Sequence, residues 1–336
     1  MGVYIIAEAG VNHNGNMDLA FEMIDIAAKA GADCIKFQAY KAEELATPDA
    51  SKATYQVEAT GGSESQLDML RRLEVTSDMH AELHAKCKEI GIDFLCTPFD
   101  ADSADMLVER FNLPILKIPS GEIINLPYLR RLGALKKKIF MSTGMATVEE
   151  IDEALAVLEE AGTQRNMVTL LHCNTQYPTP FEDANLLALQ SLSKTFPDCA
   201  IGYSDHTPGI TCPIAATALR AVLVEKHFTL DRSMEGPDHL ASIEPKELIA
   251  MVKAIRETEQ ALGTGIKKPT PSEKANINIA RRFLVADTFI KKGESFTPEN
   301  IAPRRTGVGG ISPMCWDKII GTSAPRDFVP GEVIEL

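Results

Sequence analysis

The chain has 336 residues, of which 45% are hydrophobic and 24% charged, an ordinary composition for a globular protein with a large core and more than one domain. Its 34 basic and 47 acidic side chains give a net charge of −13, which argues against nucleic acids and anionic membranes as partners. We therefore expect any anionic substrate to be held at a local positive site, because the overall field repels it.

The seven cysteines are odd in number and contain no Cys-x-x-Cys pair, which favours a reducing compartment over a disulfide framework. The first apolar run begins at Val3 and leaves no room for a signal peptide, and no apolar run is long enough to span a membrane. These features predict a cytoplasmic protein.

Apolar runs alternate with helical patterns through the first 262 residues or so. The runs are continuous rather than alternating, as expected for strands that are covered on both faces. Helices are expected at Asp18–Ala30, Thr76–Ile90, Val148–Ala161, Asn185–Thr195, Cys212–Leu219 and Pro245–Leu262, with a short one after residue 100. Thr147 and Glu150 form a capping box at the start of the third of these. A long polar loop that includes Thr60–Ser65 is expected after the second strand.

The number, order and total length of these units predict an α/β fold, a (β/α)8 TIM barrel over residues 1–265. An open doubly wound sheet is the alternative, but no Gly-x-Gly-x-x-Gly motif opens a helix. Residues 266–280 are rich in Gly, Lys and Pro and read as a linker. Residues 281–336 lack the barrel pattern and form a small domain that we expect to dock on a partner surface.

Polar side chains end every expected strand. They are Glu8, Lys36 with Gln38, Thr97, Lys117 with Ser120 and Glu122, Ser142 with Thr143, His172 with Asn174, Ser204 to His206, and Glu225 to His227. In a barrel of this kind such residues line the active site. Two histidines with carboxylates at one mouth predict a divalent-metal site with positions open for water or substrate. The alternative is a pair of core histidines that are satisfied by backbone groups.

Lys36 and Lys117 directly follow apolar residues, so their stems are expected to be buried and their ammonium groups to point into the mouth. They would neutralise a phosphate or carboxylate, or else pair with a neighbouring Glu; a Schiff-base role is a third option. Glu8 and Glu122 are candidates for acid–base catalysis or for counter-ions of those lysines.

His80 and His84 have the i, i+4 spacing of metal ligands on a helix. We interpret them as a solvated helix face, because the helix is an outer one and no third ligand is close in sequence.

The motifs AEAGVNHNG, KFQ, CTPFD, KIPSGE, STGM, LHCNTQYPTP, GYSDHT, EKHFTL and GPDHLAS resemble the sialic acid synthase family of bacterial nonulosonate synthases. The resemblance covers nearly the whole chain, because the stretch with RRTGVGGISP is similar to the family's small antifreeze-like (SAF) domain. The forms EAGVNHNG, CNTQYPTPFED and LDRSMEGPDH look closer to the legionaminic acid synthase branch than to the N-acetylneuraminate branch.

The resemblance implies a metal-dependent transferase. It would condense phosphoenolpyruvate with 2,4-diacetamido-2,4,6-trideoxymannose, with C–O cleavage, to give N,N′-diacetyllegionaminate and phosphate; N-acetylmannosamine, giving N-acetylneuraminate, is the alternative sugar. The metal, Mn²⁺ or otherwise Mg²⁺ or Co²⁺, would be held by His206 and His227. The residues implied to bind phosphoenolpyruvate are Lys36, Thr97, Lys117, Ser120, Asn174 and Ser204. Those implied to bind the sugar are Glu8, Gln38, Tyr177, Asp238 and Arg305, and Glu8, Glu122 and Lys117 join the two histidines as catalytic residues.

The family is also a domain-swapped homodimer, in which Arg305 of one chain would reach the other chain's sugar. Two positions depart from the family's pattern. Asn174 and Thr175 stand in swapped order, so that the assignment of Asn174 could move by one residue, and Thr306 replaces a usual proline, which leaves Arg304 as an alternative to Arg305.

Overall fold

The computed structural model describes residues 2–60 and 64–336; residues 61–63, part of the expected polar loop, lie outside them. The chain divides into two compact units, Met1–Gly263 and Thr264–Leu336. Each unit has a hydrophobic core of its own. In the described part of the chain, no helix combines the length and the apolar character that a membrane crossing requires.

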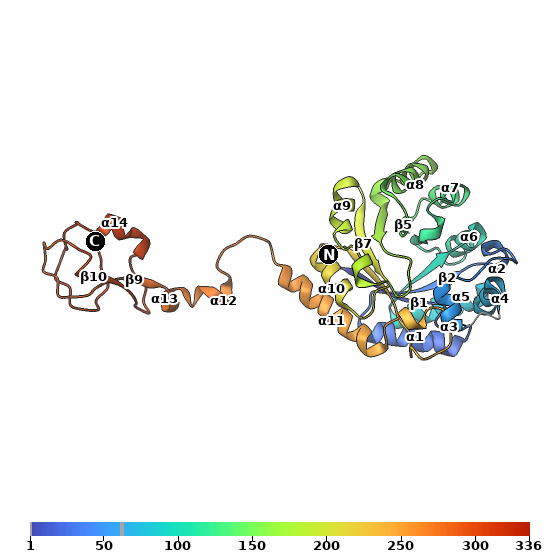
Figure 1. Cartoon of the computed structure of the whole chain (residues 1–336), viewed down its shortest axis with the longest axis horizontal. Helices are drawn as coiled ribbons and strands as arrows, with labels where there is room; N and C mark the ends of the chain where they lie inside the picture. Colours follow the sequence, from blue (N-terminus) through green and yellow to red (C-terminus); the bar gives the residue numbers. More distant parts are fainter. Residues whose placement is uncertain (1, 61–63) are drawn as a thin grey trace. The chain divides into compact units, whose positions relative to one another are not determined.

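Eight parallel strands form a single sheet in the order β3-β2-β1-β8-β7-β6-β5-β4, and β3 also contacts β4, so the sheet closes into a ring (Figure 1). The strands are β1 (Tyr4–Gly10), β2 (Cys34–Ala39), β3 (Asp93–Pro98), β4 (Ile115–Ile118), β5 (Lys138–Ser142), β6 (Val168–His172), β7 (Ala200–Asp205) and β8 (Leu223–His227). The predicted TIM barrel is confirmed.

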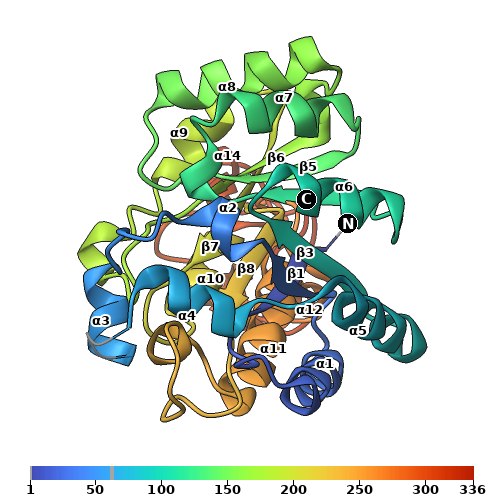
Figure 2. The ribbon, with the colours of Figure 1, turned by 90° about the vertical axis from the view of Figure 1, so that its right-hand side faces the viewer.

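Helices surround these strands, as Figure 2 shows. They are α1 (Met17–Ala30), α5 (Ser77–Ile90), α6 (Ala101–Glu109), α7 (Leu126–Ala134), α8 (Val148–Ala161), α9 (Ala188–Thr195), α10 (Thr211–Ala218) and α11 (Pro245–Leu262). The predicted capping box is present at α8, where Thr147 accepts from the backbone of Glu150 and the Glu150 carboxylate accepts from the Thr147 backbone. The apolar faces of the helices and the outward side chains of the strands form the main core.

Inside the barrel the strands build two different layers, because side chains two residues apart point to the same face. The lower layer is an apolar cluster made of Ile6, Cys34, Leu95, Phe140, Leu171 and Leu223. Two residues further along the same strands stand Glu8, Lys36, Thr97, Ser142, Cys173 and Glu225. Strand β7 contributes Gly202 at the lower level, where a Cβ would come within 2.6 Å of the Leu171 side chain. The apolar layer therefore closes the barrel below a polar one.

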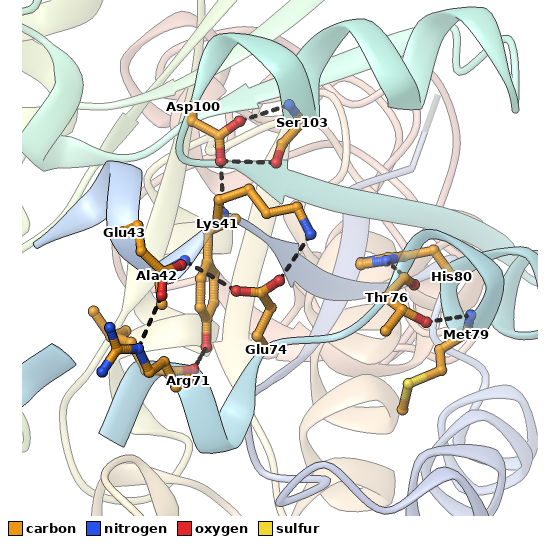
Figure 3. Close-up of polar contacts among 12 residues, drawn as sticks. Lys41, Ala42, Glu43, Arg71, Glu74, Thr76, Met79, His80, Asp100 and Ser103 are labelled. Carbon is orange, nitrogen blue, oxygen red and sulfur yellow. Dashed lines mark hydrogen bonds and ion pairs between the residues drawn. The ribbon is translucent and has the colours of Figure 1, made fainter. Parts of the chain in front are cut away.

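The long loop expected after β2 contains three helices, and that prediction was wrong. The helices are α2 (Ala42–Leu45), α3 (Thr54–Thr60) and α4 (Gln66–Leu73). Ser65 caps α4 by accepting from the backbone of Asp68, and Met69 and Leu73 pack in a small cluster with Val11 and Tyr40. The helices are short and their outer faces are polar, so the apolar period in the sequence is weak. Figure 3 shows how polar contacts hold α2 and α4 to the barrel.

The interpretation of His80 as part of a solvated helix face was also wrong. His80 is fully buried on α5, and one ring nitrogen contacts the backbone oxygen of Thr76 at 2.9 Å (Figure 3). The other ring nitrogen contacts the backbone oxygen of Gln38 at 3.1 Å. His84 is half-buried, and its ring lies 5.5 Å from the ring of Phe94. Neither ring forms part of a metal-binding cluster within the described residues.

The second unit contains β9 (Arg282–Ala286) and β10 (Ile301–Arg305), which pair antiparallel. Three one-turn helices accompany them, α12 (Pro271–Lys274), α13 (Ile277–Ala280) and α14 (Trp316–Ile319). Phe296 and Phe328, both fully buried, lie in its core. The segment expected as a linker, residues 266–280, therefore includes the helices α12 and α13.

The described residues also form short 3-10 turns. They are η1 (Ser120–Glu122), η2 (Arg165–Met167), η3 (Phe181–Asp183), η4 (His239–Ala241) and η5 (Pro313–Cys315).

Candidate active site

A cavity of about 330 Å³ opens above the polar layer of the barrel. Its wall contains most of the residues that the sequence predicted for a site, namely Glu8, Lys36, Gln38, Thr97, Lys117, Ser120, Tyr177, Ser204, His206, His227 and Asp238. They come from the carboxyl ends of the strands and the loops that follow, which is where barrel enzymes carry their active sites.

Two lysines and two glutamates form a buried ionic cluster on the cavity floor. Lys36 Nζ lies 2.8 Å from Glu8 Oε2 and 3.7 Å from Glu225 Oε2, and Lys117 Nζ lies 3.2 Å from Glu225 Oε1. Hydroxyl groups complete the cluster. Lys36 donates to Thr97 Oγ1 at 2.8 Å, Lys117 donates to Ser142 Oγ at 2.7 Å, and Ser204 donates to Glu225 Oε1 at 3.0 Å.

The two carboxyl groups differ in acidity. Burial raises the pKa of Glu8 to about 7, although the ammonium group of Lys36 opposes the shift. Burial acts the same way on Glu225, but Lys117 and Lys36 outweigh it and lower the pKa of Glu225 to about 2. The pKa of Lys36 is raised, since the two carboxylates outweigh burial, whereas burial lowers the pKa of Lys117. When Glu8 is protonated and both lysines are charged, the cluster carries a net positive charge, which suits an anionic ligand.

His206 and His227 lie together at the cavity wall, with ring centroids 5.4 Å apart. Burial lowers the pKa of His206 to about 4 and that of His227 also, so both rings are neutral near pH 7. His206 Nδ1 contacts the carbonyl oxygen of Asn174, which leaves its Nε2 lone pair free. Nδ1 of His227 is buried and has no hydrogen-bond partner within the described residues. Neutral imidazoles with free nitrogens are the donors that a divalent transition metal prefers.

A third protein ligand is not in place. Among residues 2–60 and 64–336, no group of three or more His, Cys, Asp or Glu side chains is arranged to hold a metal ion. Asp238 Oδ2 lies 3.9 Å from His227 Nδ1, and burial raises the pKa of Asp238 to about 6. The residues present fit a two-histidine site that water or substrate oxygens complete.

The strand ends that carry the histidines are joined by a second ion pair on the outer face of the barrel. Lys226 Nζ lies 2.6 Å from Asp205 Oδ2, and both side chains are fully buried. Asp205 also accepts from the Tyr203 hydroxyl at 2.9 Å and from the Thr207 backbone at 3.1 Å. Side chains of a strand alternate between the outside and the inside of the barrel. The outward ion pair of Asp205 and Lys226 therefore holds the two strand ends from which His206 and His227 point inward.

The loop after β1 holds the loop after β8. Asn12 Nδ2 donates to the Phe228 carbonyl and to Ser242 Oγ, both at 2.9 Å, and Ser242 donates to the Asp238 carbonyl at 2.7 Å. His239 Nδ1 lies 2.7 Å from Thr229 Oγ1. The polar loop that starts at Asn12 therefore shapes the mouth, and it positions Asp238.

Of the strand-end residues predicted to line the site, Thr143, His172, Asp205 and Lys226 are not on the cavity wall. Three of the residues that the family resemblance implied also lie elsewhere. Glu122 ends η1 and accepts from Asn125 at the surface, and it is not on the cavity wall. Asn174 caps its own loop by accepting from the Gln176 backbone at 2.8 Å, whereas its neighbour Thr175 lines the cavity. This matches the swapped order noted in the sequence. Arg305 belongs to the second unit, where it is exposed on β10.

Two groups of cavity residues had no predicted role. Glu225 is the first: it was predicted at the mouth as a carboxylate beside the histidines, but its pairing with both lysines was not predicted. The second group comes from the helices after β2. Tyr55 of α3 stacks on Tyr177 at 5.1 Å, and Tyr177 stacks on His206 at 4.0 Å. No signal in the sequence pointed to these helices, because the segment was expected to be a loop.

Comparison with known proteins places this site in context. Residues 23–267 match the model of the NeuB family, and residues 281–336 match the SAF domain. The chain is 51% identical to the N,N′-diacetyllegionaminic acid synthase of Campylobacter jejuni, over 98% of both chains. It is 38% identical to the enzyme with the same name from Legionella pneumophila, over 99% of this chain and 94% of that one.

A solved structure, the N-acetylneuraminic acid (sialic acid) synthetase of Leptospira borgpetersenii in complex with citrate, is also similar. It superposes with a TM-score of 0.73 at 36% identity, over 82% of this chain and 90% of that chain.

Proposed function

The chain belongs to the NeuB family, and from this premise we propose that it is an N,N′-diacetyllegionaminate synthase. The reaction joins phosphoenolpyruvate to 2,4-diacetamido-2,4,6-trideoxymannose and releases phosphate. The observation that carries the proposal is the convergence of Lys36 and Lys117 on one cavity floor beside two neutral histidines.

The bonds made and broken define what the residues must do. C3 of phosphoenolpyruvate attacks the aldehyde carbon of the open-chain sugar, and a C–C bond forms while C2 becomes cationic. Water adds to C2, and the tetrahedral intermediate loses phosphate by C–O cleavage. The product is an α-keto acid. The lysines hold the phosphate and the carboxylate throughout, with Thr97 as a hydrogen-bond donor and the Ser204 hydroxyl beside them.

In this proposal His206 and His227 hold a divalent ion, Mn²⁺ first and Mg²⁺ or Co²⁺ as substitutes, which polarises the aldehyde oxygen when bound. Glu8 is assigned the proton transfer that accompanies water addition, because its pKa of about 7 lets it accept or give a proton near neutrality. Glu122, the other candidate of the sequence analysis, is not on the cavity wall. Gln38, Tyr177 and Asp238 are assigned to the sugar.

We also propose a domain-swapped homodimer in which Arg305 enters the partner's cavity. Arg304 forms an ion pair with Asp287 in its own unit. Arg305 is exposed and has no ion pair within the described residues, so it is the arginine that remains available.

The decisive experiment is phosphate release from phosphoenolpyruvate with Mn²⁺, in which the trideoxy sugar is compared with N-acetylmannosamine. We expect a clear preference for the trideoxy sugar and loss of activity with a chelator. Preference for N-acetylmannosamine would move the enzyme to sialic acid synthesis, the activity named for the Leptospira relative. Activity that persists in chelator, with borohydride trapping at Lys36 or Lys117, would instead identify a lysine-imine aldolase.

A further inference from the structure

The cavity has two unlike sides. Its floor is the charged cluster of Glu8, Lys36, Lys117 and Glu225, whereas one side is built by the helices after β2. We call this side the α2–α4 wall, and define it by Leu45, Tyr55, Gln56, Gln66 and Leu70. All five side chains are partly accessible, and none of them is charged.

The α2–α4 wall is fixed to the barrel by a set of polar contacts (Figure 3). At the start of α2, Lys41 donates from its side chain to Glu74 Oε1 at 2.8 Å, and its backbone N–H donates to Asp100 Oδ2 at 2.9 Å. The Ala42 backbone donates to Glu74 Oε2 at 3.0 Å. Glu74 follows α4 directly, so one carboxylate joins the beginning of α2 to the end of α4.

Packing beneath the α2–α4 wall fixes α4 as well. Met69 and Leu73 are each 1% exposed and pack against Val11 and Tyr40 of the barrel. The Tyr40 hydroxyl donates to the Leu70 carbonyl at 3.2 Å. With α4 held on this side, the Leu70 side chain is presented to the cavity in a defined position.

The chemistry of the two sides orients the ligand. The floor can neutralise a carboxylate and a phosphate, so the anionic substrate lies there. The aldehyde carbon of the sugar must meet the anionic substrate near His206 and His227. The distal carbons of the sugar then extend away from the floor. An uncharged surface of two leucines and two glutamines suits methyl groups and amides, because leucine gains from contact with a methyl group and a glutamine amide hydrogen-bonds an acetamido group.

We propose that the α2–α4 wall selects the substituents at the distal end of the sugar, the C6 methyl group and the C4 acetamido group. This inference rests on the proposed function and assigns the choice of sugar to that wall. Leu45 and Leu70 contact the methyl groups, and Gln66 pairs with the amide. Gln56 contributes its Nε2 donor, because its Oε1 accepts from the Ala53 backbone at 3.0 Å. The C6 hydroxyl group of N-acetylmannosamine would lose its hydrogen bonds to water against the leucines and gain no hydrogen-bond partner. The α2–α4 wall therefore disfavours N-acetylmannosamine.

The test replaces Leu70 with glutamine, a residue of similar length that also favours helix. Three sugars are compared: the 2,4-diacetamido trideoxy sugar, N-acetylmannosamine, and 6-deoxy-N-acetylmannosamine, which differs from the second only at C6. We expect Leu70→Gln to lower kcat/KM for both 6-deoxy sugars about tenfold relative to N-acetylmannosamine. The KM for phosphoenolpyruvate should stay within about twofold, since the floor is unchanged.

Arg72→Gln is the matched control, because it places the same side chain on the exposed face of α4 and removes only a surface ion pair with Glu64. Leu45→Gln gives an independent second variant, and the same shift is expected there. Equal losses for all three sugars, or a change in the KM for phosphoenolpyruvate as large as the change for the sugars, would overturn the assignment.

Equilibrium binding of the same sugars by calorimetry separates this inference from the proposed function. If the wild-type enzyme turns over none of the sugars, the proposed function fails. The assignment of the α2–α4 wall still stands if the wild-type protein binds the 6-deoxy sugars more tightly and Leu70→Gln removes that preference. Equal affinity of the wild-type protein for all three sugars would refute it.

Discussion

Glu225 and Lys117 form a buried ion pair at the centre of the cavity floor, with Oε1 and Nζ 3.2 Å apart and each side chain 4% exposed. The other carboxylate oxygen of Glu225 lies 3.7 Å from Lys36 Nζ. The two ammonium groups therefore share the Glu225 carboxylate, and Glu8, 2.8 Å from Lys36 Nζ, is a second partner of Lys36. An anionic substrate would add further negative charge next to the ammonium groups of Lys36 and Lys117. The substrate and Glu225 would therefore both neutralise these two lysines.

We predict that Glu225→Gln lowers the free energy of unfolding of the unliganded protein by about 3 kcal/mol, because it leaves the buried ammonium group of Lys117 without its carboxylate partner. Phosphoenolpyruvate should raise the melting temperature of this variant by more than it raises the melting temperature of the wild-type protein. Thermal unfolding with and without phosphoenolpyruvate measures both effects. An equal shift in the two proteins would show that the ligand does not bind at these lysines.

The polar layer of the barrel was predictable because strand geometry is local. Ile6 and Glu8 point the same way since they stand two residues apart, and the same rule links Leu223, Glu225 and His227. The strand-end residues could therefore be assigned to one mouth from the order of the strands alone.

The helices after β2 were not predictable in the same way. Met69 and Leu73 are buried only because Val11 and Tyr40 come from distant parts of the chain to meet them. The sequence showed that Asn174 and Thr175 stand in swapped order, but the backbone of the loop after β6 decides which of the two side chains faces the cavity. A pattern of residue types does not encode such a turn.

The metal assignment predicts that His227→Gln abolishes turnover and lowers the affinity for Mn²⁺ by on the order of 100-fold or more, because the site loses one of only two protein ligands. Calorimetric titration with Mn²⁺ measures the affinity without any assay of activity. His84→Gln is the matched control, since His84 lies on α5 and packs against Phe94. Unchanged Mn²⁺ binding in His227→Gln would remove His227 from the site.

The buried pair of Lys226 and Asp205 predicts an asymmetric mutational result. Lys226→Met should destabilise the fold by about 3–5 kcal/mol, because it leaves the Asp205 carboxylate buried without a cation. Asp205→Asn combined with Lys226→Met removes both charges and should recover a substantial part of that loss. Chemical denaturation of the single and double variants measures the coupling. If the double variant is as unstable as the sum of the single variants, the ion pair is not what joins β7 to β8.

His13 predicts part of the acid sensitivity of the protein. Its Nδ1 accepts from the Gly15 backbone at 3.0 Å, and burial lowers the pKa of His13 to about 4. The unfolded chain takes up a proton near the ordinary histidine pKa of about 6.5, whereas the folded state does not until about pH 4. Stability is therefore lost as the pH falls from about 6.5 to 4, by up to about 1.4 kcal/mol per pH unit.

Replacement of His13 by Asn removes this group, so the free energy of unfolding should depend less steeply on pH by about one proton in that interval. Urea denaturation at several pH values measures the slope. The other buried histidines should account for the pH dependence of stability that remains in this variant. An unchanged slope in His13→Asn would mean that His13 is protonated in the folded state.

The domain-swapped arrangement predicts complementation between two inactive variants. Arg305→Ala lacks the arginine that enters the partner's cavity, and His206→Ala lacks a metal ligand in its own cavity. In a mixed dimer, the barrel of the Arg305→Ala chain is intact and receives Arg305 from the His206→Ala chain. Random exchange of equal amounts should restore about a quarter of wild-type activity, since half the dimers are mixed and each has one complete site. Activity that stays at zero after mass spectrometry has verified subunit exchange would place Arg305 in its own chain's site or outside the reaction.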